Sequence, residues 1–356
     1  PEHAAQPPLD DPVYRKVMAL RAARALHSNA SPFQVVQTHY KPFARARLVA
    51  EARCKPPETL YIDLRAQEMG DEPAAYNAFP ALEGVHAWPL HSGPGLETVH
   101  FCFDAHEFAR FLDEHHLAAG EAPLPRLLRY VPRKRALFRH DVKVRSYIKC
   151  YERGRDHEAA NNIALLEHAR PLPFNTPRLI AYDRHRRALV MSEVPGVPLT
   201  ALLDHASPRV FASVGRALAA LHRSDLTPQA RWTIDRLVAA LDKAMRDVKL
   251  ALPWVGEQLD ERLTLIAERR TQLAFDEQTP IHGNLFGDQI LIDSDRVGIV
   301  DWDDFGIGDP LHDIGRLAAH VMFALRRPAQ CRKHFDAMLA AYAEDTGRAV
   351  TMKRLR

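Results

Sequence analysis

One short pair of apolar runs constrains the fold of this chain more than any other feature. Residues 290–292 and 297–300 flank the turn DSDR and therefore predict a β-hairpin, yet they lie in a half of the sequence whose periodicity is otherwise helical. Before Pro195 the pattern is mainly that of strands, and after it mainly that of helices. We therefore expect an α+β chain in two lobes, with a ligand site in the cleft between them.

The other elements follow from local periodicity. The strands are expected at residues 32–40, 44–54 and 59–66 and in a hairpin over 176–194, and the helices at 11–28, 104–118, 157–169, 208–225, 232–252, 260–275, 311–327 and 329–345. The segment 70–97 is rich in proline and glycine, so we expect a long irregular connection there.

A weak internal echo links two parts of the strand-rich half. Residues 40–46 and 130–136 share the pattern Y-x-P-x-x-R-A, and each precedes a similar strand, LYIDL in one case and SYIKC in the other. Only the second strand carries a lysine, Lys149, where the first has Asp63. So short a match can arise by chance, and both duplication and coincidence stay open.

Composition places the chain among globular proteins with balanced charge. Of its 356 residues 46% are hydrophobic and 26% charged, and the net charge is +3. No apolar run approaches the roughly 20 residues that cross a bilayer, and the first residues lack a secretory pattern, so we expect a cytoplasmic protein without membrane or nucleic-acid partners. Four scattered cysteines, with no C-x-x-C pair, argue against a disulfide framework or a zinc site. An arginine-rich run at 129–140 fits either a solvated strand edge or an anion contact.

Polar side chains lie at both ends of the expected hairpin. They are His282, Asn284, Asp288, Gln289, Asp301 and Asp303. Carboxylate and amide oxygens held at adjacent ends of a hairpin are the hard ligands that Mg²⁺ prefers and shares with phosphates. The sequence therefore predicts a cation site beside the hairpin.

These residues resemble the aminoglycoside phosphotransferase and choline kinase family, relatives of the protein kinases. The family pattern is H-G-D-x-x-x-x-N followed further on by an apolar run and I-D-W/F-D/E, and this chain has HGNLFGDQ and then IVDWDD. The segments YIKCY, LVMSEVPGVPL, LAALHRSD and GDPLHDIGRLA fall in the expected order, so the resemblance covers residues 128–345. It implies a bilobal protein-kinase-like fold, ATP or GTP with Mg²⁺, and phosphoryl transfer to a hydroxyl of a small molecule such as a sugar, an aminoglycoside or an amino alcohol.

The resemblance also implies which residues hold the metal ion. Asp301 stands where the family chelates Mg²⁺; a carboxylate that only caps the next turn is the alternative. Gln289 stands where most members have Asn, and its amide oxygen is still a hard ligand. Asp303 is either a second, water-mediated ligand or a residue that holds the loop.

Asn284 occupies the family's catalytic-base position. An Asp there orients the acceptor hydroxyl and takes its proton, which a carboxamide cannot do near pH 7. Losing a general base typically removes about 10²- to 10⁴-fold of rate, but phosphoryl transfer depends mainly on positioning and metal, so residual activity is compatible with Asn284. A phosphotransferase is the first prediction and a nucleotide-binding pseudokinase the second. His282 is, by resemblance, a structural residue under this loop.

In the strand-rich lobe, Lys149 is expected to contact the α- and β-phosphates of the nucleotide. A solvent-facing lysine is the alternative, because an unpaired ammonium is costly to bury in mid-strand. A helix glutamate orients this lysine in the family, and we expect Glu158, or failing that Glu167, in this role. Glu193 and Val194 belong to the connector that is expected to bind adenine through its backbone.

The chain divides into three parts. Residues 1–127 form an extension that caps the upper lobe, duplicates part of it or mediates a homodimer, residues 128–194 form the upper lobe, and residues 195–356 form the helical lobe with the catalytic and metal loops. No glycine-rich phosphate loop is visible, and YVPRKRA occupies its expected place. A protein kinase proper fits less well, because the chain lacks an H-R-D loop and an A-P-E segment.

Overall fold

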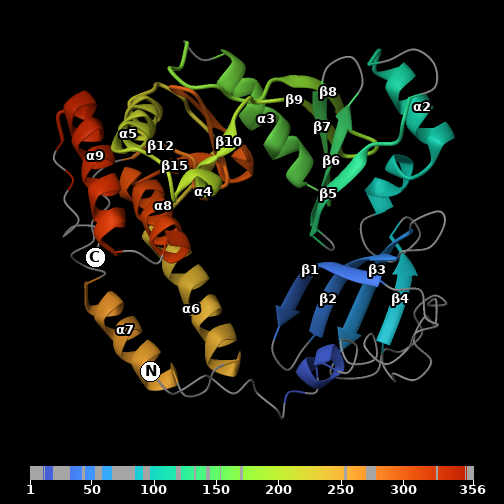
Figure 1. Ribbon diagram of the computed structural model, residues 1–356, viewed down its shortest axis with the longest axis horizontal. Coiled ribbons are helices and arrows are strands. Elements are labelled where there is room, and N and C mark those ends of the chain that lie inside the picture. Colours follow the sequence, from blue (N-terminus) through green and yellow to red (C-terminus); the bar gives the residue numbers. More distant parts are fainter. Residues whose placement is uncertain are drawn as a thin grey trace.

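A computed structural model describes most of the chain. The described residues are 11, 13–18, 33–41, 45–52, 58–65, 85–90, 97–117, 122–131, 134–141, 145–152, 154–168, 171–251, 255–269, 278–325, 328–348 and 350. Among them, no helix combines the length and the apolar character that a membrane span requires. The strands form a four-stranded sheet, a five-stranded sheet and two small three-stranded sheets, and most helices gather in one lobe (Figure 1).

The upper lobe is built on a five-stranded antiparallel sheet. Its strand order is β5-β6-β7-β9-β8. The strands are β5 (Arg126–Val131), β6 (Arg135–Asp141), β7 (Arg145–Tyr151), β8 (Leu179–Asp183) and β9 (Ala188–Ser192). The expected hairpin over 176–194 is therefore confirmed, with its turn between β8 and β9.

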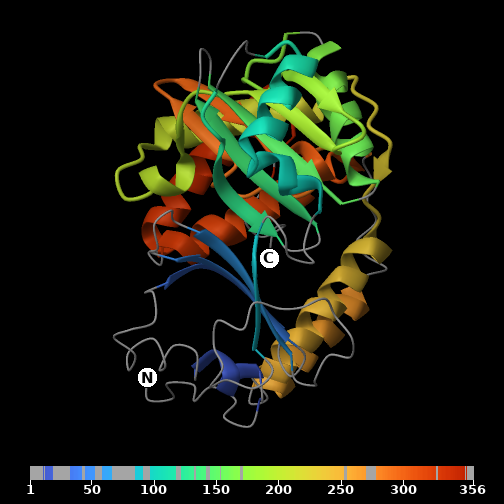
Figure 2. The same cartoon turned by 90° about the vertical axis from the view of Figure 1, so that its right-hand side faces the viewer.

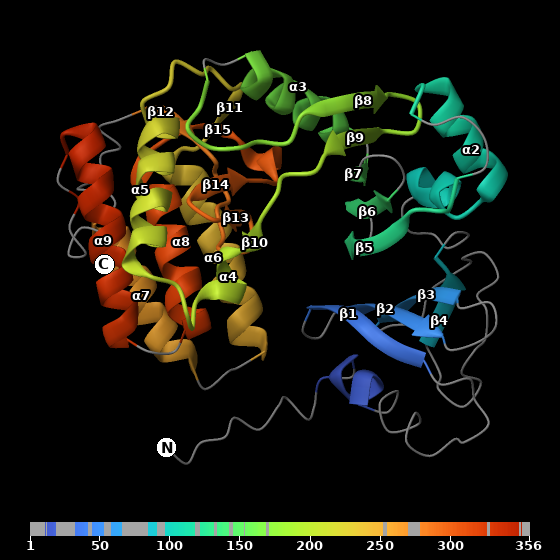
Figure 3. The ribbon, with the colours of Figure 1, turned by 45° about the horizontal axis from the view of Figure 1, so that its top comes forward.

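Helices cover both faces of this sheet (Figure 3). On one face, Phe101 of η1 (Glu97–Cys102) and Phe108 of α2 (Ala105–Glu114) share a buried core with Phe138 and Ile148 of the sheet. On the other face, α3 (Arg155–His168) packs Ile163 against the sheet. Residues of η1 and α2 belong to the core of the upper lobe, although they precede residue 127. The expected boundary after residue 127 therefore does not separate two cores.

The chain passes from β9 through a short connector into the helical lobe (Figure 3). The elements of this lobe are β10 (Val197–Pro198), α4 (Leu199–Leu202), α5 (Pro208–His222), β11 (Ala230–Arg231), α6 (Ile234–Ala251), α7 (Gly256–Arg269), β12 (Thr279–Ile281), β13 (Ile290–Asp293), β14 (Arg296–Ile299), η3 (Trp302–Asp304), β15 (Gly306–Gly308), α8 (Pro310–Leu325) and α9 (Pro328–Thr346). Helices α5, α8 and α9 enclose one core with β13 and β14, which form the hairpin that the sequence predicts. Helices α6 and α7 extend from this lobe as a separate pair (Figures 1 and 2).

A four-stranded antiparallel sheet precedes the upper lobe. Its strands β1 (Phe33–Lys41), β2 (Arg45–Ala52), β3 (Glu58–Arg65) and β4 (Val85–Pro89) follow one another in order, and β1 lies next to β5 (Figure 2). Strands β1 to β3 were expected. Strand β4 was not, since it lies inside the segment 70–97 that was interpreted as irregular. Of the helix expected over 11–28, residues 13–18 are helical and most of the others lie outside the described residues.

The two sheets repeat the same strand register. Tyr40 pairs with Ala46 across β1 and β2, and Tyr130 pairs with Ala136 across β5 and β6. Buried positions also correspond, with Ala46 and Leu48 in one sheet matching Ala136 and Phe138 in the other. Asp63 lies opposite Arg47, as Lys149 lies opposite Leu137. The repeated sequence pattern therefore corresponds to a repeated meander of strands, as duplication predicts. The first copy has Asp63 where the second has Lys149.

Candidate functional site

The expected site residues meet in a crevice between the upper sheet and the hairpin β13–β14. The crevice has a volume of about 380 Å³, and Lys149, Gln289, Asp301 and Asp303 all line it. Lys149 comes from β7, Gln289 directly precedes β13, and the two aspartates follow β14. Residues of both lobes that lie far apart in the sequence therefore form one site.

Lys149 is the cation at the centre of this crevice. Its Nζ lies 2.6 Å from Oδ1 of Asp301 and 2.6 Å from Oδ1 of Asp303. The side chain is 8% exposed, which excludes the alternative of a lysine on a solvent-facing strand surface. Both carboxylates of the helical lobe therefore compensate one buried ammonium of the upper lobe.

Two further residues of the upper lobe, Arg135 and Tyr151, reach the same carboxylates. Arg135 donates from Nη1 to Oδ2 of Asp303 at 2.6 Å and from Nη2 to Oδ2 of Asp301 at 3.4 Å. The hydroxyl of Tyr151 donates to Oδ1 of Asp303 at 2.8 Å. Sequence reasoning missed both residues, although Arg135 lies in the YVPRKRA segment at the expected place of a phosphate loop.

Burial and the neighbouring charges shift the pKa of Asp301 in opposite directions. Burial alone would raise the pKa of this carboxyl, but the positive charges of Lys149 and Arg135 and the hydrogen bond from Lys149 lower the pKa well below its ordinary value. The carboxylate is therefore ionised at neutral pH, as a metal ligand must be. Its backbone has a φ of +68°, a left-handed conformation that is rare outside glycine and is typical of strained functional positions.

The amide of Gln289 faces Asp301 through its nitrogen. Its Nε2 donates to Oδ2 of Asp301 at 3.2 Å, and its Oε1 accepts the backbone N–H of Phe286 at 2.8 Å. The expected role of Gln289 as a ligand requires the oxygen to face the ion, so the amide would have to turn. The two aspartate carboxylates need no such change, and with Gln289 they form a set of hard oxygen donors that fits Mg²⁺.

Asn284 lies in the loop before the hairpin, where its side chain meets an arginine of α8. Its Oδ1 accepts a hydrogen bond from Nη2 of Arg316 at 2.5 Å. Arg316 also lies over the ring of Phe286, with its guanidinium carbon 4.8 Å from the ring centroid. Burial lowers the pKa of Arg316 below its usual value. In the same loop, Asp288 is exposed at the edge of the crevice.

A buried carboxylate of α8 holds the base of this loop. Asp313 is fully buried and accepts the backbone N–H groups of His282 at 2.6 Å and Gly283 at 2.9 Å. The His282 ring lies beneath the loop, with Nε2 3.0 Å from the carbonyl oxygen of Val300. Both residues therefore shape the loop from below, as the resemblance implies for His282.

No helix glutamate orients Lys149 among the described residues. Glu158 is exposed and its described partner is Arg155, whose Nη1 lies 3.8 Å from its Oε2. Glu167 accepts the backbone N–H of Leu179 at 2.7 Å. The expected pairing of Lys149 with Glu158 or Glu167 is therefore wrong for this structure. Asp301 and Asp303, which follow the hairpin, pair with Lys149 instead.

The connector between the lobes borders the crevice. Val194 is buried and lines it, whereas Glu193 turns outward, where its Oε1 lies 2.6 Å from Nη1 of Arg145. Pro198 and Met191 line the crevice on either side of the connector. The backbone of this segment thus runs along the wall of the crevice, while binding of adenine by Glu193 and Val194 stays a prediction.

Comparison with known proteins identifies a family and a fold. A sequence profile described as the phosphotransferase enzyme family matches residues 134–352. No curated protein is a significant match to the sequence. Among solved structures, the choline kinase LicA from Streptococcus pneumoniae superposes with a TM-score of 0.52 and 14% identity, covering 70% of this chain and 84% of that one. The aminoglycoside phosphotransferase APH(3'')-Id from Streptomyces rimosus gives a TM-score of 0.49 and 19% identity, covering 65% and 89%.

The profile match lies within the two lobes and leaves out the N-terminal sheet. The matched residues begin at 134, in the turn before β6, and end after α9. The α+β, bilobal protein-kinase-like fold expected from the sequence is thereby confirmed.

Proposed function

Because the chain belongs to the phosphotransferase enzyme family, we propose that it transfers the γ-phosphoryl group of ATP or GTP to a hydroxyl group of a small molecule. The observation that carries this proposal is the meeting of Lys149, Asp301 and Asp303 in one crevice between the lobes. A lysine facing two carboxylates is the set of residue types that binds nucleotide phosphates together with their metal ion.

Asp301 and Asp303 would hold Mg²⁺, and Gln289 would join them once its amide has turned. A bound Mg²⁺ neutralises phosphate charge and aligns the transferred group. Lys149 contacts both carboxylates at 2.6 Å, so its ammonium is within reach of phosphate oxygens that approach the same crevice. Arg135 lies beside them and offers a second cation for the phosphates, in place of a glycine-rich loop.

The acceptor hydroxyl is expected beside Asn284. Its carboxamide can orient a hydroxyl through a hydrogen bond, but it cannot take the proton. A second candidate function follows from this residue, namely binding of nucleotide without transfer. Arg316 keeps the Asn284 side chain ordered, so the position is preserved in shape even though its base is absent.

One variant separates the two candidates. Turnover of ATP is measured for the native chain and for Asn284→Asp with a panel of sugars, aminoglycosides and amino alcohols. A transferase should show acceptor-dependent ATP consumption, raised about 10²- to 10⁴-fold in Asn284→Asp because the variant regains a general base. If neither protein consumes ATP with any acceptor while both bind Mg²⁺ and nucleotide, the chain binds without transfer.

A further inference from the structure

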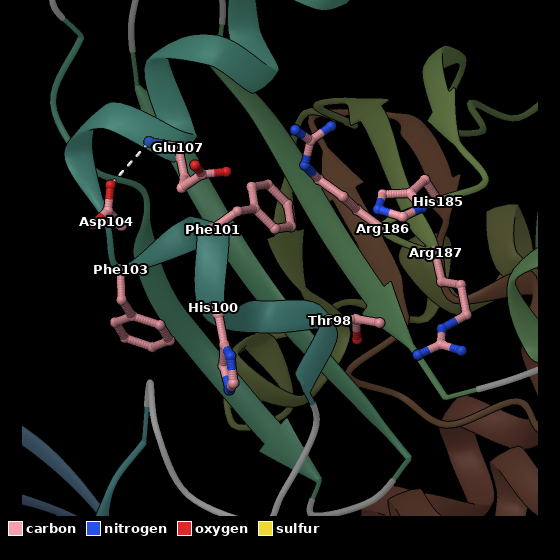
Figure 4. A pocket seen from close by; sticks show the side chains of 9 residues that line it. All are labelled: Thr98, His100, Phe101, Phe103, Asp104, Glu107, His185, Arg186 and Arg187. Atoms are coloured by element: carbon pink, nitrogen blue, oxygen red, sulfur yellow. Dashed lines mark hydrogen bonds between the residues drawn. The ribbon is translucent and has the colours of Figure 1, made fainter.

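A second cavity lies on the opposite face of the upper sheet from α3, and it shares no lining residue with the crevice. It has a volume of about 700 Å³ and lies between the η1–α2 segment and the turn from β8 to β9 (Figure 4). His185, Arg186 and Arg187 of the turn form one wall, and η1 residues including His100 form the other. Basic side chains therefore face the space from both walls.

Most other charges around this cavity are already compensated. Asp104 caps α2 by accepting the backbone N–H groups of its first turn at 2.9 Å, and Glu107 forms an ion pair with Arg110. Arg186 lies 2.6 Å from both Glu114 and Asp183, and its guanidinium covers the ring of Phe101. These groups leave little charge for a ligand to neutralise.

Arg187 differs from Arg186. In the part of the chain that the structure describes, no ion pair involves Arg187, and its buried Nε has no hydrogen-bond acceptor. A buried N–H group without an acceptor is destabilising, and more so when the group is charged. Its half-buried guanidinium lines the cavity without an ion-pair partner among the described residues, so it is a cation whose charge an anion in the cavity would balance. His185 stands beside it on the same turn and is exposed.

We propose that this cavity binds a phosphate-bearing small molecule, with Arg187 as its principal contact and His185 as a further donor. A guanidinium pairs well with phosphate oxygens, and the imidazole of His185 on the same turn adds a further donor. The ring of Phe103 in the opposite wall offers an apolar surface to the rest of the ligand. This site lies outside the crevice, and its binding of a ligand does not depend on the proposed transfer reaction.

Backbone contacts join the two walls of the cavity to the crevice through Tyr151. Thr98 of η1 donates from Oγ1 to the carbonyl oxygen of Tyr151 at 3.1 Å, and the Tyr151 N–H donates to the carbonyl oxygen of Arg187 at 3.0 Å. The hydroxyl of Tyr151 in turn donates to Asp303 at 2.8 Å. A ligand that draws the walls together would act on the backbone of Tyr151, so the two sites are expected to be coupled.

The test uses inorganic phosphate as the probe and thermal stabilisation of the full chain as the readout, against chloride at equal ionic strength. Phosphate should stabilise the wild type, and at least a tenfold higher concentration should be needed for the same shift in Arg187→Asn, in which Asn tolerates the left-handed φ of +50°. The matched control is Arg184→Asn, an exposed arginine of the same turn outside the cavity. His185→Ala, at an exposed position, should weaken the effect as well.

Phosphate can bind in the crevice of all these proteins, so it is the difference between Arg187→Asn and Arg184→Asn that reports on the cavity. Equal stabilisation of Arg187→Asn and Arg184→Asn, or none of the wild type, would overturn the site. Coupling is measured as the change that phosphate causes in the affinity for Mg²⁺ and ADP, expected to be at least twofold in the wild type and absent in Tyr151→Phe. If phosphate changed the affinity for Mg²⁺ and ADP equally in the wild type and in Tyr151→Phe, the proposed coupling would be wrong. This second measurement rests on the proposed function, whereas the first decides the site even if no nucleotide binds.

Discussion

Replacing Lys149 by methionine tests the electrostatic centre of the crevice. Methionine has nearly the same length and removes only the ammonium, so little cavity is created. The lost group contacts two carboxylates at 2.6 Å, and the side chains of Asp301 and Asp303 are 19% and 6% exposed. Breaking a buried ion pair costs about 3 to 5 kcal/mol. Since Arg135 still compensates both carboxylates, we expect a loss near the lower limit, about 3 kcal/mol in the free energy of unfolding.

The loss should depend on pH in a defined direction. Lys149 and Arg135 lower the pKa of Asp301 in the folded chain, so the stabilisation is fully present above the unfolded pKa of about 3.9 and is lost as the pH falls through the lowered folded value. In Lys149→Met part of that lowering is removed. The difference between wild type and variant should therefore be full at neutral pH and should shrink in acid, below about pH 4.

Urea denaturation at neutral and acidic pH measures both effects. The matched control is Arg145→Met on the same strand, because Arg145 pairs with Asp141 and Glu193 at the surface and its loss should change stability little. Mg²⁺ should stabilise Lys149→Met more than the wild type, since the variant leaves two carboxylates without their ammonium. A loss below about 1 kcal/mol at neutral pH, the range of a surface pair, would refute this reasoning, and so would a loss that acid does not change.

Two further changes test the loop that carries Asn284. Asp313→Asn should lower the free energy of unfolding by about 2 to 4 kcal/mol at neutral pH, because a fully buried carboxylate with three donors is neutralised. Burial would raise the pKa of Asp313, but the hydrogen bond and charge of His222 lower it, so the difference in stability between wild type and variant should shrink in acid. Calorimetry at several pH values measures this difference, and a difference that does not change with pH would contradict the prediction. Gly283→Ala should cost more than the roughly 1 to 2 kcal/mol of a left-handed alanine, since its Cβ would lie 2.2 Å from the carbonyl oxygen of Asp304. Gly154→Ala, with a φ of +87° and open space around it, gives the strain alone, and equal melting temperatures for the two variants would contradict the clash.

The sequence predicts elements well where the signal is local. The hairpin β13–β14 has two apolar runs around a polar turn, and α2 has Phe108, Phe111 and Leu112 on one face, so both are recognisable without knowledge of their neighbours. Strand β4 shows the opposite case. It is five residues long, ends at Pro89 and lies in a segment rich in glycine and proline, and only its pairing with β3 makes it a strand.

The site shows the same limit for side chains. The family pattern brings Lys149, Gln289 and Asp301 to one crevice, as predicted, but the partners of Lys149 are Asp301 and Asp303, which lie 152 and 154 residues away in the chain. The resemblance implied a helix glutamate, Glu158 or Glu167, because a sequence shows which residues share a helix and not which carboxylate meets a given lysine in the fold. The arginine-rich run was expected to form either an anion contact or a solvated strand edge, and it contains both. Arg135 contacts the carboxylates of the site, whereas Arg139 pairs with Asp141 near the surface.

The meeting of Lys149, Gln289 and Asp301 around one divalent ion is the claim on which the proposed function depends, and calorimetric titration with ADP tests it most directly. The titration is run with Mg²⁺ and with a chelator, on the wild type, on Asp301→Ala and on the control Asp293→Ala, an exposed carboxylate at the far end of β13. Mg²⁺ should tighten ADP binding at least tenfold in the wild type and the control, and should have no such effect in Asp301→Ala. Equal dependence on Mg²⁺ in all three proteins would contradict the assignment.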